Sequence, residues 1–316
     1  MRYKLFGRSG LRVSELCLGT MTFGKSGPRG TPPAECEAIF REFVKRGGNF
    51  VDLAAGYGDG RAEAIVRDLI GARRAHFVLS TRLSVPEGFT DVAARMRLAL
   101  EGALRRLRTD HLDLLWLDGW TNRTAFDAVM ESIETMVCDG KVLYVGVADA
   151  PTWVVSQGNL LAGLNRWTPF VGLQCEFSLL ERRADQEALP VAEALGLSTA
   201  PRSVLAGGLL TCKYRHEELA PFLSERNQLI VEQLRDVARD LGRPPAQVAL
   251  NWVRQQGAKL VPILGARTAA QLVETLGCLD FTLTSTLLSR LACDGVASHA
   301  AAAFPSSAAP RELASA

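Results

Sequence analysis

The sequence predicts one (β/α)8 TIM barrel, an α/β fold, preceded by a short N-terminal β-hairpin. Three observations favour this fold. Short β-rich runs alternate with helical patterns of about ten or more residues, which is typical of parallel sheets. Eight such units in 316 residues fit a closed barrel. An open, doubly wound sheet is the alternative, but no G-x-G-x-x-G motif follows the first strand.

The elements are expected in a regular order. Two extended runs around a Gly-containing turn predict the hairpin over residues 3–14. The first inner strand is expected at 15–18, and the first helix at 33–46, where two glycines end it. Further strands are expected at 49–52, 77–81, 112–117, 142–147, 170–175, 197–201 and 259–262. Further helices are expected at 61–69, 89–108, 124–138, 151–164, 185–195, 225–241, 245–256 and 268–276.

Composition excludes several classes of function. The chain is 47% hydrophobic, enough for one large core, and its net charge is +2, with no Lys/Arg run that stands out. We therefore expect no nucleic-acid or membrane partner. Seven scattered cysteines without a C-x-x-C pair predict a reduced, cytoplasmic protein without a metal site. We expect no signal peptide and no membrane span, because no apolar run is long enough.

The chain is expected to form one domain. No internal linker interrupts residues 1–298, which we assign to the barrel. The Ala/Ser-rich tail at 299–316 is expected to be loosely ordered. The sequence does not distinguish a monomer from a homo-oligomer.

The segment 49–63 holds the first candidate site. A short apolar run ends in Asp52, and a Gly-rich turn then presents Tyr57 between two glycines. Side chains at the C-terminal ends of barrel strands face the mouth, where active sites form. These two residues therefore predict an active site, with a surface tyrosine in a flexible loop as the alternative.

Several segments, in the right order, resemble the aldo-keto reductase family over roughly residues 1–295. The residues from Asp52 to Gly58 resemble its Asp-Thr-Ala-x-x-Tyr-Gly signature, with Leu53 in place of Thr. The branch most similar is that of the potassium-channel β-subunit-like and aryl-alcohol dehydrogenase-like reductases. The resemblance implies an NADP(H)-dependent oxidoreductase that acts on a carbonyl or enone of a small molecule. Other matching segments are 3–24, 112–120, 140–147, 174–182, 205–214 and 261–267.

The resemblance also implies a catalytic set of Asp, Tyr, Lys and His. Asp52 and Tyr57 stand at their positions, but Arg82 occupies the Lys position and Asp118 the His position. Arginine prefers carboxylate partners, so we expect Arg82 to be clamped between Asp52 and Asp118. The clamp would draw the cation away from Tyr57 and leave the pKa of the phenol high. None of the four histidines lies at a position where it could take the place of the family's catalytic His. They are His76, His111, His216 and His299.

The nicotinamide end of the implied cofactor site departs further from the family. The Ser-Asn pair reads Ala148-Asp149, and the stacking aromatic aligns with Arg202, whose charge would repel an oxidised nicotinamide. Arg267 stands where the family grips the 2′-phosphate. By resemblance, the cofactor-binding residues are Gly19, Thr20, Asp149, Gln174, Arg202, Leu205, Gly207, Leu209, Lys213, Gly265, Arg267, Gln271 and Glu274. Met21 and Trp120 are the implied substrate-pocket residues, with core packing as the equal alternative for both Thr20 and Met21.

Five altered positions at the reacting end (82, 118, 148, 149 and 202) leave two other functions open. A non-redox enzyme, such as a dehydratase, isomerase or cyclase, would use Asp118 and Tyr57 as acid and base. A catalytically inactive homologue would bind the cofactor or regulate a partner without chemistry. The acids Glu176 and Glu181 are interpreted as solvated or structural.

Overall fold

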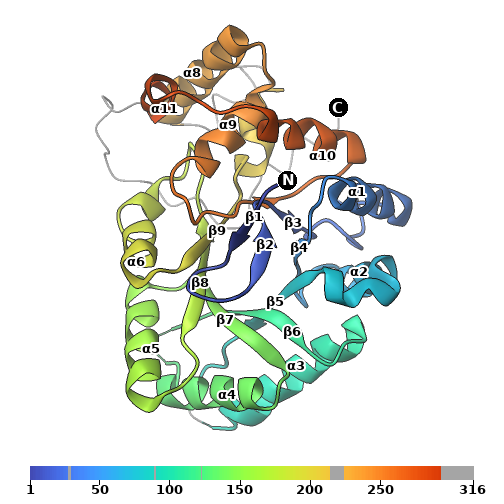
Figure 1. The fold of residues 1–316 in the computed structure, drawn as a ribbon, viewed down its shortest axis with the longest axis vertical. Helices are drawn as coiled ribbons and strands as arrows, with labels where there is room; N and C mark the ends of the chain where they lie inside the picture. Colours follow the sequence, from blue (N-terminus) through green and yellow to red (C-terminus); the bar gives the residue numbers. More distant parts are fainter. Residues whose placement is uncertain (28–29, 89, 122, 214–223, 293–316) are drawn as a thin grey trace.

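The computed structural model describes residues 1–27, 30–88, 90–121, 123–213 and 224–292, so the tail at 299–316 lies outside the described residues. Eight parallel strands pair in the order β10-β3-β4-β5-β6-β7-β8-β9, with helices around them (Figure 1). This arrangement confirms the predicted (β/α)8 TIM barrel. The strands are β3 (Cys17–Gly19), β4 (Phe50–Asp52), β5 (Val78–Ser84), β6 (Leu112–Asp118), β7 (Val142–Ala148), β8 (Phe170–Glu176), β9 (Ser198–Arg202) and β10 (Ile263–Leu264).

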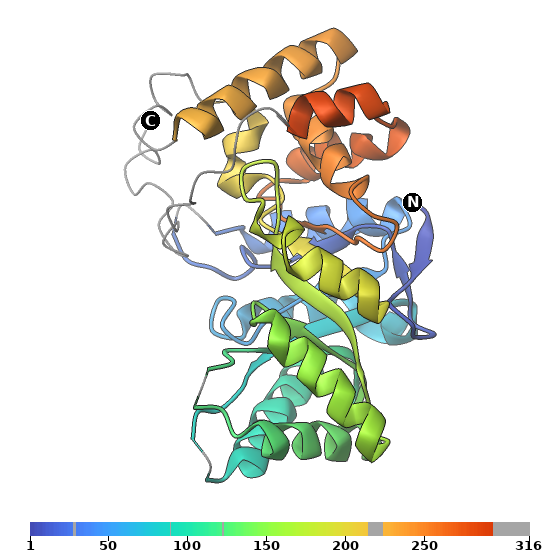
Figure 2. The ribbon, with the colours of Figure 1, turned by 90° about the vertical axis from the view of Figure 1, so that its left-hand side faces the viewer.

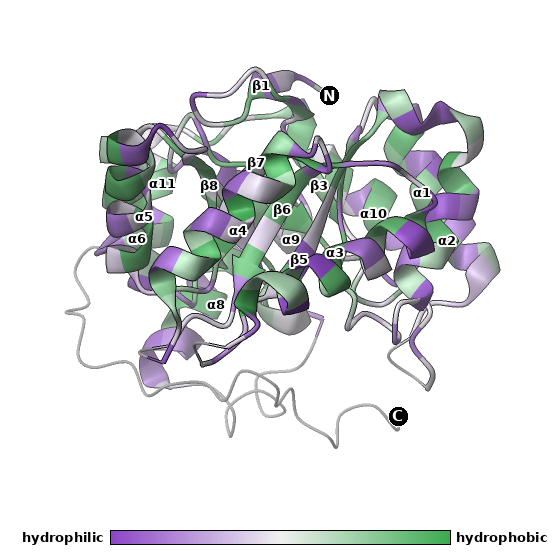
Figure 3. Cartoon of the chain, turned by 90° about the horizontal axis from the view of Figure 1, so that it is seen from below, coloured by the Kyte–Doolittle hydropathy of each residue, from purple (hydrophilic) through white to green (hydrophobic). Residues whose placement is uncertain are grey.

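Several of the helices around the sheet are amphipathic and turn an apolar side towards it. Helix α1 begins with a proline in its first turn and buries residues at positions 36, 39, 40 and 43, a spacing that covers one side of a helix. Figure 3 shows hydrophilic and hydrophobic stripes on α1 and α2. Helix α11 was not predicted from the sequence. The helices are α1 (Pro33–Lys45), α2 (Arg61–Ile70), α3 (Val92–Leu107), α4 (Phe126–Cys138), α5 (Thr152–Asn165), α6 (Ala188–Leu195), α8 (Glu225–Leu241), α9 (Pro245–Arg254), α10 (Ala269–Leu276) and α11 (Ser285–Ala292).

The predicted hairpin is confirmed and closes one end of the barrel (Figure 2). Its strands are β1 (Tyr3–Leu5) and β2 (Arg12–Ser14). The turn between them places Phe6 in the barrel interior, where its ring packs edge-on against the Trp116 ring, with 6.0 Å between the ring centroids. Glycines on neighbouring strands make room for these rings: a Cβ at Gly146 would overlap Trp116, and one at Gly172 would overlap Phe6. This end is filled, so a site must form at the opposite, C-terminal end of the strands.

The prediction of the last strand at 259–262 is wrong. The pairing with β3 is made by β10, at Ile263–Leu264. The preceding residues instead bond Thr199 of β9, through the Val261 N–H at 2.8 Å and the Lys259 carbonyl at 3.2 Å. Pro262 separates the two pairings because it has no N–H to donate, although its carbonyl accepts from the next strand. The closing strand of the barrel is therefore split in two.

Glu15 forms a buried ion pair below the barrel. Its side chain is 3% exposed and accepts from the Arg2 N–H at 2.8 Å and the Arg254 guanidinium at 2.9 Å. Burial alone would raise the pKa of Glu15, but these hydrogen bonds outweigh it and lower the pKa from 4.5 to about 2. The resulting stabilisation is present above pH 4.5 and is lost as the pH falls towards 2.

Glu15→Gln is therefore expected to lower the free energy of unfolding at pH 7 by about 3 kcal/mol, because Arg254 loses its buried partner. Urea unfolding at pH 7 and at pH 3 measures the effect, which shrinks at the lower pH. The control Glu37→Gln removes an exposed pair with Arg41 and should cost less than about 1 kcal/mol. Equal losses for the two variants would contradict the prediction.

Candidate active site

The ends of three neighbouring strands bring the predicted catalytic residues to the C-terminal mouth. Asp52 is the last residue of β4, Asp118 the last of β6, and Arg82 lies near the end of β5. Tyr57 follows β4 in a tight turn closed by its own N–H on the Ala54 carbonyl at 2.9 Å. Gly58 holds the turn at φ +58°, where a Cβ would lie 2.8 Å from the Gly24 carbonyl oxygen. The turn therefore needs glycine beside the tyrosine.

Arg82 is held by a different set of partners from the one predicted. Its Nη1 lies 3.1 Å from Asp149 Oδ2 and 3.9 Å from Asp118 Oδ2, and its Nη2 donates to Gln174. No ion pair within the described ranges joins Arg82 to Asp52. The predicted clamp between Asp52 and Asp118 is therefore wrong in one arm, which Asp149 supplies instead.

Asp52 does not reach Arg82 because it lies deeper in the barrel. It pairs in register with Ser80, two residues before Arg82 on β5. The Ser80 hydroxyl donates to Asp52 Oδ1 at 2.8 Å, and the Gln174 amide donates to the same oxygen at 3.2 Å. The Gln174 side chain is fully buried and links Asp52 to Arg82, so both ends of its amide are engaged.

Arg202 continues the same network at the end of β9. Its Nε lies 3.0 Å from both carboxylate oxygens of Asp149, and its Nη1 lies 3.3 Å from Glu176 Oε2. Glu176 belongs to the mouth because it pairs in register with Arg202. This contact was not predicted from the sequence, although the two-residue period of β8 from Gly172 through Gln174 could have indicated it. Two carboxylates thus balance the charge of Arg202.

Burial is the main cause of the pKa shifts of Asp52 and Tyr57. It raises the pKa of Tyr57 to about 12. The charge of Asp52 raises the pKa further, whereas the guanidiniums of Arg82 and Arg202 lower it. The high phenol pKa agrees with the sequence-based prediction, but its main cause is desolvation rather than the displaced cation. Burial also raises the pKa of Asp52, against the opposing charge of Arg82.

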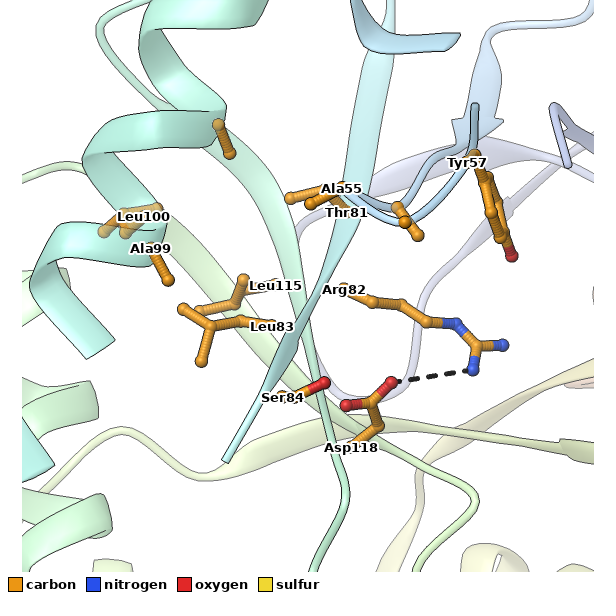
Figure 4. Close-up of a pocket in the computed structure, with 13 residues that line it drawn as sticks. Ala55, Tyr57, Thr81, Arg82, Leu83, Ser84, Ala99, Leu100, Leu115 and Asp118 are labelled. Atoms are coloured by element: carbon orange, nitrogen blue, oxygen red, sulfur yellow. Dashed lines mark ion pairs between the residues drawn. The ribbon is translucent and has the colours of Figure 1, made fainter. Parts of the chain in front are cut away.

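A cavity of about 310 Å³ opens beside these residues (Figure 4). Figure 4 shows Tyr57 and the Arg82 guanidinium on one side of strand β5. The side chains of Leu83, Leu115, Ala99 and Leu100 lie on its other side, next to α3. Trp120 does not line this cavity: it is 7% exposed and packs on the Phe126 ring at 5.1 Å. The lining residues are Ala54, Ala55, Gly56, Tyr57, Thr81, Arg82, Leu83, Ser84, Ala99, Leu100, Ala103, Leu115 and Asp118.

Some implied cofactor and substrate residues have packing roles. A Cβ at Gly19 would lie 2.8 Å from Ile263 Cγ2, so this glycine allows β3 and β10 to approach. Thr20 is buried and its hydroxyl donates to the Asp52 carbonyl at 2.9 Å. Met21, in contrast, is 54% exposed and lies outside the cavity lining.

The implied phosphate-binding residues lie on open backbone. Gly207 and Gly208 adopt positive φ in the 3-10 helix η3 (Ala206–Thr211), and a Cβ at either position would have nothing within 4 Å. Leu205 and Leu209 flank them and are half-buried, while Lys213 beyond them is exposed. These glycines leave room for a ligand to approach the main chain.

Arg267 lies just before α10. Its N–H donates to Gln271 Oε1 at 3.0 Å, and Thr268 caps the helix by accepting from the Gln271 N–H at 3.2 Å. Within the described part of the chain, no ion pair engages the exposed Arg267 guanidinium. Gly265, before it, has nothing near its Cβ position, and Glu274 further along α10 is exposed.

The described residues offer neither a metal cluster nor a membrane span. Among them, no group of three or more His, Cys, Asp or Glu side chains is placed to hold a metal ion. None of the helices formed by these residues is both long enough and apolar enough to cross a bilayer. His76 and His111 lie next to the N-terminal ends of β5 and β6, away from the mouth, and His216 and His299 lie outside the described residues.

A barrel whose mouth gathers a carboxylate, a phenol and a guanidinium beside a cavity has the form of a small-molecule enzyme. The family model described as "Aldo/keto reductase family" matches residues 15–292. The chain therefore belongs to the aldo/keto reductase family.

Curated relatives agree with this membership. The chain is 35% identical over 313 residues to the uncharacterized oxidoreductase YrpG of Bacillus subtilis, covering 92% of this chain and 95% of the relative. It is 32% identical to norsolorinic acid reductase A of Aspergillus parasiticus, covering 87% and 76%. It is 29% identical to aryl-alcohol dehydrogenase (NADP(+)) of Phanerodontia chrysosporium, covering 87% and 81%. Family and relatives together support an oxidoreductase.

Proposed function

We propose that this protein is an NADP(H)-dependent oxidoreductase that reduces a carbonyl or enone of a small molecule, with Tyr57 as the proton donor. The observation that carries this proposal is the cavity at the mouth, which Tyr57, Arg82 and Asp118 line together. The relative named for aryl alcohols suggests an aromatic compound as the substrate.

The residues present fit NADP(H) at its phosphate end. Arg267 offers a guanidinium without an ion-pair partner in the described ranges, and a 2′-phosphate suits such a group through paired charge-assisted hydrogen bonds. Gly207 and Gly208 give a pyrophosphate access to the backbone. One relative carries NADP(+) in its name. These observations support the choice of NADP(H) over NAD(H).

The nicotinamide end is compatible with either redox form. A lone Arg202 would repel the positively charged oxidised ring. Here its charge is balanced by Asp149 and Glu176, so this obstacle is removed. Gln174 and Asp149 are already engaged with Arg82, and they would have to give up or share these contacts to hold the carboxamide.

The chemistry divides between the cofactor and this chain. When bound, the cofactor supplies the hydride. Tyr57 gives its proton to the substrate oxygen as negative charge develops there, and a pKa of about 12 keeps the phenol protonated at neutral pH. Arg82 stabilises the developing charge, and Asp52 positions Arg82 through the Gln174 amide. The raised pKa therefore makes the phenolate that alcohol oxidation needs scarce at neutral pH.

Titration with NADPH, followed by tryptophan fluorescence and by calorimetry, tests the cofactor assignment. We expect NADPH to bind at least about 10-fold more tightly than NADH, and Arg267→Ala to remove most of this selectivity. Arg166→Ala, at the exposed end of α5, is the matched control and should retain it.

Each outcome of the titration has a distinct meaning. No NADPH binding would overturn the reductase assignment and leave a non-redox enzyme on the same scaffold. Binding without turnover on a panel of aldehydes, ketones and enones would indicate a catalytically inactive cofactor-binding homologue. NADPH consumption with any of these substrates would support the proposal.

A further inference from the structure

A buried carboxylate lies behind the loop that presents Tyr57. Glu63 is in the first turn of α2, shortly after Tyr57 in the chain, and is fully buried. Its Oε1 accepts from the Thr81 hydroxyl on β5 at 3.2 Å, and its Oε2 accepts from Arg106 Nε on α3. This one side chain therefore joins α2, β5 and α3, and both of its oxygens are engaged.

The start of α2 makes room for the contact with Arg106. Gly60 caps the helix with a φ of +82°, and a Cβ there would lie 2.7 Å from Arg106 Cδ. The glycine therefore lets the Arg106 side chain cross the start of α2 to reach Glu63. A carboxylate in the first turn of a helix is also favoured by the helix dipole. Because Glu63 is fully buried, packing fixes the geometry of this pair, unlike that of an exposed ion pair.

The contacts of Glu63 lead to the two groups that the proposed reaction needs. On the α2 side, the Ala62 N–H donates to the Tyr57 carbonyl at 3.3 Å, so the first turn of the helix holds the tyrosine loop. On the β5 side, Thr81 directly precedes Arg82. Successive residues of a strand point to opposite faces, so Thr81 turns towards α2 while Arg82 turns towards the mouth. Figure 4 shows Tyr57 and the Arg82 guanidinium on the same side of β5.

We infer that Glu63 is a positioning residue for the proposed reaction. Its bond to Thr81 fixes the start of α2 against β5 and thereby sets the position of the Tyr57 phenol relative to the Arg82 guanidinium. Glu63 is not among the described residues that line the cavity, so it acts through the tyrosine loop and not by contact with a ligand. The inference rests on the proposed function for the roles of Tyr57 and Arg82, but the coupling between α2 and β5 is a property of the fold.

A purely structural role explains the buried pair less well. An ion pair of this kind is often no more stabilising than apolar residues of the same size, because both charges lose their hydration. Its hydrogen bonds, in contrast, are directional and fix the distance between the elements that they join. That distance matters here, because proton transfer needs the Tyr57 oxygen within about 3 Å of the substrate oxygen that Arg82 stabilises.

Thr81→Val tests the inference, because it removes the hydroxyl and keeps the size of the side chain. Glu63 retains Arg106 as its partner, so we expect the variant to fold. The kcat for carbonyl reduction should fall at least about 10-fold, since small displacements of reacting groups are costly. The dissociation constant of NADPH should stay the same. Thr81→Ser, which retains the hydroxyl, should restore most of the activity.

Hydrogen exchange followed by mass spectrometry measures the same coupling without cofactor or turnover. The Tyr57 N–H donates to the Ala54 carbonyl, and the Ala62 N–H donates to the Tyr57 carbonyl, so both amides report on the tyrosine loop. In Thr81→Val, we expect these amides to exchange about 10-fold faster than in the wild-type protein, because a buried carboxylate oxygen loses its donor.

Thr109→Val is the matched control. It removes a hydroxyl that accepts from Arg74 Nε at 3.0 Å, just before β6 at the closed end of the barrel. It should lower the melting temperature without changing kcat or the exchange of the tyrosine loop.

Three results would overturn the inference. They are unchanged exchange in Thr81→Val, equally faster exchange in Thr81→Val and Thr109→Val, and faster exchange in Thr81→Val with an unchanged kcat. Failure of the wild-type protein to bind NADPH would instead overturn the proposed function, and the exchange result would still show whether Glu63 holds the tyrosine loop.

Discussion

Replacing Tyr57 with Phe is expected to lower kcat/KM for carbonyl reduction by about 10²–10⁴-fold, the usual contribution of a general acid. The change removes the phenol oxygen and keeps the ring that packs against the core. Among the described residues, Tyr57 is the one phenol in the cavity lining. The affinity for NADPH should stay the same, because the implied phosphate-binding residues lie elsewhere. Steady-state kinetics and a NADPH titration of the same preparation measure both quantities.

Tyr3→Phe provides the matched control for this loss. Its phenol lies on the hairpin, is 42% exposed and donates to the Gly47 carbonyl at 2.8 Å. The substitution removes the same atom at the closed end of the barrel, so activity should be unchanged. Retention of more than about a tenth of the activity in Tyr57→Phe would assign the proton transfer to another group.

Asp149→Asn is expected to speed the reverse reaction, alcohol oxidation, at alkaline pH. Oxidation needs the phenolate of Tyr57, and the pKa of about 12 keeps this form scarce, so wild-type kcat/KM should still be rising with pH at about pH 10. Asp149 raises this pKa by its charge and also holds Arg82. Neutralising it lowers the pKa, and each unit of that decrease raises the phenolate fraction at about pH 10 roughly tenfold.

The pH profile of kcat/KM for oxidation measures this shift, since it reports the titration of the free enzyme. The alkaline limb should move to lower pH in Asp149→Asn. In Glu176→Gln, which removes a carboxylate paired with Arg202 only, it should move less. An unchanged profile in Asp149→Asn, or an equal shift in both variants, would show that Asp149 does not control the phenol.

Sequence patterns located the barrel well because its strands and helices have regular periods. The inner strands begin and end within about three residues of their predicted positions, apart from the last. That strand was misplaced because the apolar run around Pro262 extends beyond the residues that pair with β3. A pattern of apolar residues cannot show that a proline divides one strand between two neighbours.

The sequence predicted which residues lie at the mouth of the barrel, but not which of them form ion pairs with one another. Strand periodicity and the family resemblance together brought Asp52, Arg82 and Asp118 to one end of the barrel, as the structure has them. The partner of Arg82 could not be predicted, because Asp149 follows β7 in a left-handed conformation with φ of 51°. This conformation breaks the alternation of the strand, so the period no longer indicates where the carboxylate lies.

The split closing strand has a mechanical consequence. At the closing seam, β9 is joined to the residues before β10 by the isolated bridge between Thr199 and Leu260, so the sheet is weakly closed at this point. Arg202 is the last residue of β9, on one side of this gap, and Arg267 follows β10, on the other side. A dinucleotide bound by both arginines would connect β9 to β10 across the gap. Local opening of this seam, well short of global unfolding, would then be the motion that cofactor binding suppresses.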